Sequence, residues 1–325
     1  MITLYRRQDD VVVAEVFTEG NDLPQDVIWI DADRPTDSEL ASLQKQMGIQ
    51  LPSKDDVWKN QILNRLYMRN GVAYMTAAVI SKVDTPYPEG SAITFVLKQD
   101  ALLTIRVISP TSFKEFAHRI VSPTEKFPTA AHVLEGLLEE MIDRVSHNIE
   151  IVEDMLDIVS HRIFGTDAYE GKAQNPSELM KSVLKQMGVC ADLNSKINES
   201  LHSINRLLHF FKQTVPEAQM LGRDVDILIA DTLVLTRQTD FAAEKIAFQL
   251  DATLGMINVE QNVIIKMFSV VAVFFMPPTL VASIYGMNFK FMPELEWING
   301  YPMAISLMVL CAVVPYLYFR KKGWL

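Results

Sequence analysis

The sequence has few of the residues and motifs on which most enzymes and secreted proteins depend. Cys190 and Cys311 are the only cysteines among 325 residues, so neither a disulfide framework nor a CxxC metal site is available. There is no GxGxxG or P-loop pattern, and no Ser/His/Asp or Cys/His arrangement typical of nucleophilic catalysis. The opening residues, MITLYRRQDD, contain no apolar core of the signal-peptide kind. We therefore expect a protein that is not an enzyme and whose amino-terminal end stays in the cytosol.

Basic charge is also scarce in this chain. It has 30 Lys and Arg residues against 40 Asp and Glu residues, which gives a net charge of -10. No basic patch with interleaved aromatic residues is present, so we expect no nucleic-acid partner. The acidic excess instead suits the binding of cations. A mean hydropathy of +0.12 with 22% charged residues is too polar for a polytopic membrane protein and too apolar for an ordinary soluble one. We therefore expect the chain to consist of a large soluble part and a small membrane part, a combination that explains both values.

Two uncharged apolar segments occur near the carboxyl end, at residues 267–285 and 301–319. A helix of about 20 residues crosses about 30 Å of hydrocarbon, so each segment is long enough to span a membrane and contact lipid. Residues 286–300 form a short polar loop between them, and the tail 320–325 carries Arg320, Lys321 and Lys322. Because basic residues flank the cytoplasmic ends of membrane helices, we expect both termini in the cytoplasm and the loop outside.

The part before the membrane segments changes from one type of periodicity to another. Residues 1–128 alternate between strand-like and helix-like periods, which predicts a cytosolic α/β domain. Helices are predicted at 38–47, after a Thr36-Asp37 cap, and at 112–121. Strands are predicted at 11–13, 27–30, 71–80, 92–97 and 102–107.

Long helices are predicted to connect this domain to the membrane. Residues 129–216 read as a helical hairpin interrupted by a polar break at 165–175. From about Glu217 a third helix meets no proline until Pro277, so we expect 217–266 to be the stalk part of one long helix. The heptad-like spacing of apolar residues favours packing of these helices as a coiled-coil stalk.

One stripe of this last helix differs from its other faces. Steps of three and four residues back from Gly286 reach mainly small, hydroxyl and amide side chains: Ser283, Thr279, Met276, Ala272, Ser269, Ile265, Asn262, Asn258, Gly255 and Asp251. A stripe of small residues is typical of close helix packing in membranes. It also suits a pore wall, which a single helix per subunit can form only in a symmetric ring. The polar continuation through Asn262 and Asp251 favours the pore, with Ile265 and Met276 as dry constrictions.

The sequence around the end of this stripe resembles the CorA family of magnesium channels. The similarity begins at Tyr285-Gly286-Met287-Asn288 and continues as Met292-Pro293-Glu294-Leu295. A loop of the form YGMNF…MPEL…W…GYP, two terminal membrane helices and a basic KKGWL end accompany it. The match extends back into the first membrane segment through MPPTLVASIYGMNF, residues 276–289. Before about residue 250 the resemblance consists only of the order of the predicted domain and helices.

The resemblance implies a funnel-shaped homopentamer in the inner membrane that transports Mg²⁺, and also Co²⁺ and Ni²⁺, which form similar hydrated octahedra. It implies that Gly286, Met287 and Asn288 form the outer selectivity site and that Asn262, Met276 and Thr279 face the pore. It further implies that Asp251 binds a regulatory divalent cation between subunits. Asp84, which follows a predicted strand, is the candidate partner carboxylate from the neighbouring subunit.

The residue types at the outer mouth agree with this interpretation. Mg²⁺ dehydrates reluctantly, so a ring of neutral Asn288 amides is suited to accept protons from its bound water. Gly286 is expected to permit a close turn at the helix end. Glu294, in the external loop, is a candidate for raising the local cation concentration. Two alternatives stay open: a zinc-transporting relative of the same architecture, and a membrane-anchored sensor whose hairpin serves only as an anchor.

Overall fold

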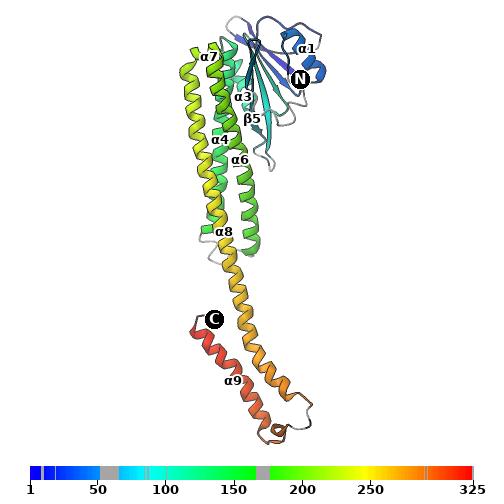
Figure 1. The fold of residues 1–325 in the computed structure, drawn as a ribbon, viewed down its shortest axis with the longest axis vertical. Coiled ribbons are helices and arrows are strands. Elements are labelled where there is room, and N and C mark those ends of the chain that lie inside the picture. The colour runs from blue at the N-terminus through cyan, green and yellow to red at the C-terminus, as the bar shows by residue number, and fades with distance from the viewer. Residues whose placement is uncertain are drawn as a thin grey trace. The chain divides into compact units, whose positions relative to one another are not determined.

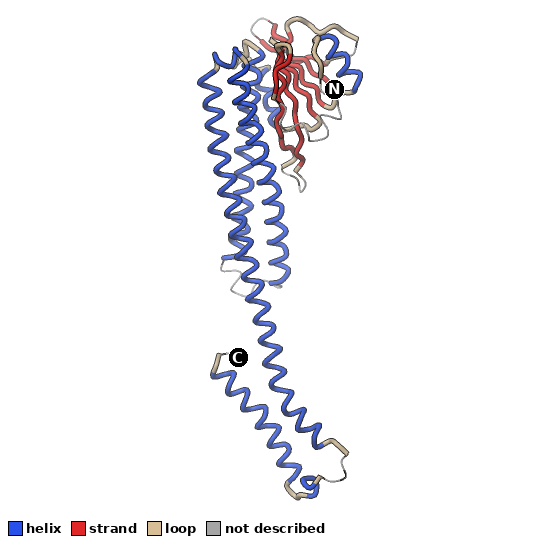
Figure 2. Tube along the Cα trace, in the orientation of Figure 1, coloured by secondary structure: helices blue, strands red, loops and turns tan. Residues whose placement is uncertain are grey.

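The computed structural model describes all residues except 9–10, 19, 52–65, 84, 86–87, 100, 166–175, 289, 291 and 324–325. The chain forms two compact units, Met1–Leu250 and Asp251–Leu325. The first unit combines a β-sheet with long helices, and the second consists mainly of helix (Figures 1 and 2). The boundary falls within the 217–266 segment expected as a stalk, because one helix contributes to both units.

A mixed β-sheet organises the first unit. Its strand order is β2-β1-β3-β7-β6-β5-β4, and the pair of β3 and β7 is parallel whereas the other neighbouring pairs are antiparallel. The strands are β1 (Ile2–Gln8), β2 (Val11–Val16), β3 (Val27–Asp33), β4 (Tyr67–Arg69), β5 (Val72–Ser81), β6 (Glu89–Lys98) and β7 (Ala101–Arg106). All five predicted strands are confirmed, while β1 and β4 were not predicted.

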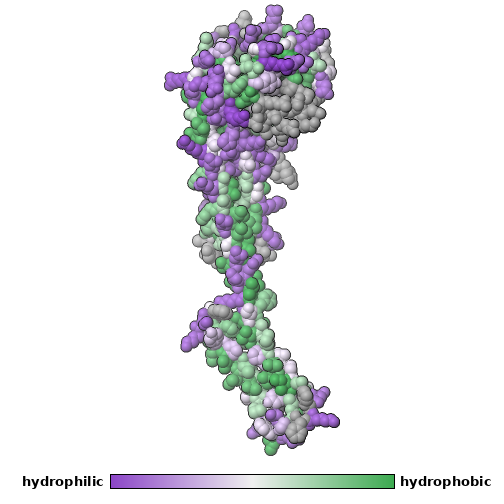
Figure 3. Space-filling view, in the orientation of Figure 1, coloured by the Kyte–Doolittle hydropathy of each residue, from purple (hydrophilic) through white to green (hydrophobic). Residues whose placement is uncertain are grey.

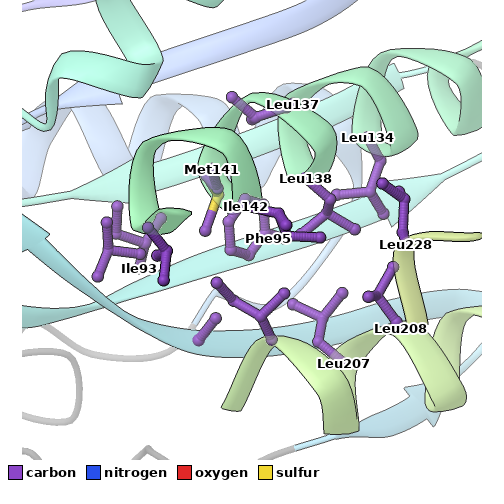
Figure 4. Packing of buried hydrophobic residues seen from close by; sticks show 14 of the residues in the cluster. Ile93, Phe95, Leu134, Leu137, Leu138, Met141, Ile142, Leu207, Leu208 and Leu228 are labelled. Atoms are coloured by element: carbon purple, nitrogen blue, oxygen red, sulfur yellow. The ribbon is translucent and has the colours of Figure 1, made fainter. Parts of the chain in front are cut away.

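The two faces of the sheet bury different sets of side chains because successive residues of a strand point to opposite sides. Trp29 and Phe95 belong to a core shared with α3 (Thr111–Ile120), α4 (Ala130–Phe164) and α6 (Pro176–Thr214). Their neighbours Ile30 and Val96 belong to the core under α1 (Asp37–Met47). Figure 4 shows the first core around Phe95, with α4 on one side and α6 on the other. The unit is therefore a three-layer α/β/α arrangement, which confirms the predicted α/β class.

The predicted cap of the first helix is present in α1. Thr36 accepts a hydrogen bond from the backbone of Glu39, and the Glu39 side chain accepts one from the backbone of Thr36. This reciprocal pair satisfies two amide groups that the first helical turn leaves free. Gly48 ends the helix with φ of 62°, a left-handed conformation that glycine adopts without steric cost.

Three long helices continue the first unit beyond the sheet. Helix α8 (Gly222–Tyr285) follows a short helix, α7 (Pro216–Met220). The long helix was expected to start near Glu217, but that residue belongs to α7, and the long helix itself starts at Gly222. The physical reason is a break at Leu221, whose carbonyl accepts the amides of Asp224 and Val225 and so begins a new helix. Polar contacts fix α6 against α8, with Asn205 donating to Thr232 at 2.6 Å and Asn198 donating to Thr239 at 2.8 Å.

A half-buried carboxylate lies on α4 near the start of α8. Burial raises the pKa of Glu135 to about 7, and repulsion from Glu139, Asp224 and Glu125 adds to the rise, against the opposing attraction of Arg119. Because the folded protein holds this proton to a higher pH than the unfolded chain does, the free energy of unfolding falls as pH rises toward 7. Above that pH, a negative charge is held next to other carboxylates.

We predict that Glu135→Gln stabilises the protein at pH 8 and has almost no effect at pH 5, where the wild-type carboxyl is already neutral. The difference between the two pH values should reach on the order of 1–3 kcal/mol. Thermal unfolding of both proteins at each pH measures it. Glu150→Gln, on an exposed part of the same helix, serves as the control. Equal stabilisation by Glu135→Gln at both pH values would show that the Glu135 carboxyl does not titrate between pH 5 and pH 8.

The second unit contains the carboxyl-terminal part of α8, a short 3₁₀ helix η1 (Pro293–Glu296) and α9 (Gly300–Lys321). Pro277 and Pro278 lie inside α8 without ending it. Each lacks the amide proton that would bond four residues back, a loss that membrane helices tolerate. Figure 3 shows apolar surface over this part of the chain. Helices α8 and α9 are both long and apolar enough to cross a membrane.

Candidate ion pathway along helix α8

The predicted stripe on the membrane part of α8 is uncovered in the single chain. Its side chains from residue 262 to residue 283 are all exposed: Asn262, Ile265, Ser269, Ala272, Met276, Thr279 and Ser283. The two large apolar members are among the most exposed, with Ile265 at 62% and Met276 at 68%. Within the described residues, neither α9 nor the loop covers this face of the helix.

A different face of α8 packs against α9. Val270 is 6% exposed, and the ring of Phe274 lies 6.0 Å from that of Tyr316 on α9. Ser283 is nine residues after Phe274, so at about 100° per residue it lies about 180° around the helix axis. Helix α9 therefore contacts the side of α8 opposite the stripe. The stripe itself is therefore free to contact either a neighbouring copy of the chain or water.

Two hydroxyl groups of the stripe have their protons engaged within the helix. Ser269 donates to the carbonyl of Ile265 at 2.8 Å, and Thr279 donates to the carbonyl of Phe275 at 2.7 Å. A hydroxyl that donates in this way offers only its oxygen lone pairs to the outside. Those lone pairs are acceptors, which suits the protons of a cation's bound water. The stripe can thus contact a hydrated cation without repelling it.

Helix α8 ends at the Gly286-Met287-Asn288 triplet. The amide of Gly286 donates to Ala282 at 2.9 Å, and the Asn288 side chain is exposed. Gly286 does not have a positive φ, so the close turn expected at this helix end does not depend on a left-handed glycine conformation. A Cβ at this position would stand 3.1 Å from the Ala282 carbonyl oxygen. Glycine instead keeps the last turn free of this tight contact.

The loop after the triplet holds Glu294 in a defined place. Glu294 belongs to η1 and is half-buried. A Cβ on Gly300 would stand only 2.2 Å from the Glu294 carbonyl oxygen, so the first turn of α9 packs directly on the backbone of η1. The amide of Gly300 also donates to Trp297 at 3.0 Å. The loop is therefore a folded element tied to α9.

Of the two residues expected to hold a regulatory cation, the structure describes only Asp251. Asp251 is exposed on α8, and Asp84 lies outside the described residues. Within the part of the chain that the structure describes, no group of three or more His, Cys, Asp or Glu side chains could hold a metal ion. A site shared between subunits needs carboxylates from two chains, so the pairing of Asp251 with Asp84 stays a prediction.

Sequence reasoning missed an apolar extension of the same stripe in the first unit. Four large side chains follow one another at intervals of seven residues on α8, and all are about half exposed or more: Ile227, Val234, Phe241 and Phe248. Among the described residues, Phe248 has a ring partner, Phe164, with ring centroids 6.1 Å apart. The signal was present in the sequence, because continuing the steps of seven residues upward from Asn262 leads through Gly255 to these four positions.

Comparisons with known proteins agree over the whole chain. The sequence model of the family described as CorA-like Mg²⁺ transporter protein matches residues 24–321. The magnesium transport protein CorA of Salmonella typhimurium is 31% identical over 302 residues, which cover 92% of each chain. The magnesium transport protein CorA of Yersinia pseudotuberculosis is 30% identical over 328 residues and 100% of both chains.

A solved structure shows the same fold. The complete CorA magnesium transporter from Methanocaldococcus jannaschii matches with a TM-score of 0.77 at 22% identity, covering 100% of this chain and 99% of the other. The match includes the sheet-containing part, the long helices and the two apolar helices at the carboxyl end. The expected fold class is confirmed.

Proposed function

Because the chain belongs to the CorA-like Mg²⁺ transporter family, we propose that it is a channel through which Mg²⁺ enters the cell down the membrane potential. The family transports magnesium across the inner membrane by means of two carboxyl-terminal membrane helices. A divalent ion that crosses 100 mV gains about 4.6 kcal/mol, at ~2.3 kcal/mol per charge. This gain drives uptake without a chemical fuel, which agrees with the lack of nucleotide-binding motifs.

The observation that carries the proposal is the uncovered stripe of α8. Helix α9 packs on the opposite side, so copies of the chain can arrange their α8 helices around one axis and keep α9 outside. Ser269, Thr279 and Ser283 then face the axis, and α9 contacts lipid. Family likeness supports five copies in a homopentamer.

The apolar part of α8 supports the same arrangement in the first unit. Val234, Phe241 and Phe248 expose more than half of their surface, which is unusual for large apolar side chains in water. A seven-residue interval is the spacing at which helices associate with one another. Copies that surround an axis would bring these side chains together and remove them from water.

The oxygen acceptors along the stripe suit an ion that keeps its water. Mg²⁺ holds six water molecules in an octahedron and gives them up reluctantly. A ring of Asn288 amide oxygens would hold the hydrated ion at the outer mouth, after which Thr279 and Asn262 would present further acceptors. Neutral acceptors bind weakly enough to release the ion again. Ile265 and Met276 would form dry constrictions between these polar levels.

Cytosolic Mg²⁺ is the proposed regulator of this pathway. When it is plentiful, the ion would bridge Asp251 to a carboxylate of the neighbouring copy, with Asp84 as the candidate, and stabilise the closed ring. Its loss would free the helices, because a ligand stabilises only the state that it binds better. Asp251 is exposed on α8, as a site shared with another chain requires.

We predict that Asp251→Ala weakens inhibition of the Mg²⁺ current by Mg²⁺ on the cytosolic side. Inhibition curves from patches or planar bilayers measure the effect, with an expected shift of about tenfold toward higher Mg²⁺ for one lost ligand. Glu260→Ala is a matched control, since Glu260 is nine residues on and about 180° around the same helix. An unchanged curve for Asp251→Ala removes this residue from the mechanism.

Ion flux into liposomes tests the function as a whole. Purified protein is reconstituted with a potential that is negative inside, and uptake of Mg²⁺, Co²⁺, Ni²⁺ and Zn²⁺ is followed in turn. We expect Mg²⁺ uptake, together with Co²⁺ and Ni²⁺ because of their similar hydrated octahedra. Preference for Zn²⁺ would indicate the zinc-transporting alternative, and absence of any flux would leave a membrane-anchored sensor.

A further inference from the structure

A pocket of about 410 Å³ lies beside the last turn of α8, next to the expected outer mouth of the ion pathway, with which it shares Gly286 and Glu294. It is lined by the end of α8, by η1 and the residues that follow it, and by the first turns of α9. Its size falls within the range of small-molecule sites. The side chains that matter for its chemistry are Tyr285, Glu294, Trp297 and Tyr301.

Three aromatic rings reach this pocket from three different elements. Tyr285 ends α8, Trp297 directly follows η1, and Tyr301 is in the first turn of α9. Among the described residues, none of these three rings contacts another ring, and no Lys or Arg side chain lies over any of them. The faces of the rings, which carry partial negative charge, are therefore available to a ligand.

One carboxylate accompanies the rings. Glu294 is half-buried and lines the pocket, and within the described part of the chain no basic side chain forms an ion pair with it. Its backbone is held by the close approach of Gly300 at the Glu294 carbonyl. The carboxylate and the Trp297 ring thus project from a backbone that α9 keeps in place. The other lining residues include Leu295, Ile305 and Met308, which are apolar.

This combination does not match the needs of a metal ion. Mg²⁺ prefers several oxygen ligands, and the side chains that line this pocket offer one carboxylate and two tyrosine hydroxyls beside apolar walls. An ammonium ion that carries alkyl groups matches every part of it. Its charge pairs with Glu294, its polarised alkyl groups lie on the faces of the rings, and its carbon chain contacts the apolar side chains.

We propose that the pocket between η1, α8 and α9 binds an organic ammonium ion, and that the bound ion inhibits transport by occupying the space beside Gly286. The inhibition rests on the proposed function, whereas the binding does not. Gly286 itself lines the pocket, and Asn288 follows two residues later. A positive ion at this position would also repel a divalent cation approaching the mouth. The ammonium group can belong to a free amine or to the headgroup of a lipid.

Calorimetric titration of the full-length protein in detergent with choline tests the binding. Neohexyl alcohol, in which a carbon atom replaces the nitrogen of choline, is the neutral control ligand, and sodium chloride controls for ionic strength. We expect heat of binding for choline and none for the alcohol. Binding of both ligands with equal affinity would overturn the proposal, because the pocket would then recognise only apolar shape.

Two variants and one matched control locate the site. Glu294→Gln removes the charge and keeps the shape, and Trp297→Leu removes one ring; each should weaken choline binding about fivefold or more. Glu296→Gln lies in the same 3₁₀ helix but not in the pocket, so its affinity should stay within about twofold. Unchanged binding in Glu294→Gln, in protein with an intact oligomer, would also overturn the proposal.

Flux measurements then separate this inference from the proposed function. External choline should reduce Mg²⁺ uptake into liposomes, and the ratio of uptake with and without choline should rise toward one in Trp297→Leu. Choline binding without any Mg²⁺ flux would uphold the site and contradict the channel. Mg²⁺ flux that choline leaves unchanged would uphold the channel and contradict the inhibitory role of the pocket.

The lipid composition distinguishes the two sources of the ammonium group. The titration is repeated in nanodiscs made of phosphatidylglycerol alone and in nanodiscs that also contain phosphatidylethanolamine. Weaker apparent choline binding in the second membrane would identify the lipid headgroup as a competing occupant. Equal affinities in the two membranes would assign the pocket to free amines.

Discussion

Replacement of Asn288 by alanine is expected to abolish selective Mg²⁺ uptake while the oligomer stays intact. Asn288 is exposed just beyond the end of α8, so its side chain contributes nothing visible to the packing of the single chain. In a ring of copies, its amide oxygens would be the first acceptors that a hydrated ion meets. A hydrated ion that enters the mouth keeps its bound water but loses hydrogen bonds from that water to the surrounding solvent. Without the Asn288 amides, no acceptor at the outer mouth would replace those hydrogen bonds.

Liposome uptake and size-exclusion chromatography together measure this effect. We expect the Mg²⁺ flux to fall by about tenfold or more, since each 1.4 kcal/mol of lost stabilisation corresponds to a factor of ten. Asn299→Ala is the matched control, because Asn299 precedes α9 in the same loop and its side chain caps nothing. Normal Mg²⁺ flux through the Asn288→Ala protein would contradict the role of this amide.

Local periodicity was sufficient to predict most elements of the fold. Each of the five predicted strands contains a run of apolar residues, and the cap at Thr36 follows a known sequence pattern. Strand β1 was missed because its second half, Arg6 to Gln8, is polar and interrupts the apolar pattern. Strand β4 has three residues, all exposed, so it carries no pattern of burial.

The ion pathway was predictable only as far as one helix determines it. The spacing of Ser269, Met276 and Ser283 gives their common face, and the structure leaves that face uncovered. The sequence did not reveal which side of α8 packs on α9, because this depends on contacts such as the one between Phe274 and Tyr316. The pocket around Trp297 was missed for the same reason, since its walls come from three elements.

The second large effect is expected in the sheet of the first unit, at a buried ion pair. Arg106 donates to both carboxylate oxygens of Asp31, at 3.0 and 2.8 Å, and both side chains are 9% exposed. Thr104 also donates to Asp31, at 2.9 Å, and Trp29 in turn donates to Thr104. The pair joins the parallel strands β3 and β7 in the middle of the sheet.

We predict that Asp31→Ala lowers the free energy of unfolding by about 3–5 kcal/mol, because it leaves the Arg106 guanidinium buried without its main partner. Asp33, which lies 3.1 Å from another nitrogen of Arg106, compensates only in part, since it is more exposed. Thermal unfolding followed by circular dichroism measures the loss. Asp157→Ala, which breaks the exposed pair with Lys245, should change stability far less.

A double substitution separates the value of the ion pair from the cost of breaking it. Asp31→Leu combined with Arg106→Met removes both charges and fills a similar volume with apolar groups. Buried pairs replaced in this way often leave stability unchanged or increase it, because two charges no longer have to be kept from water. We therefore expect the double variant to be much more stable than Asp31→Ala. If both variants lose stability equally, the hydrogen bonds through Thr104 to Trp29, rather than the unpaired charge, hold β3 and β7 together.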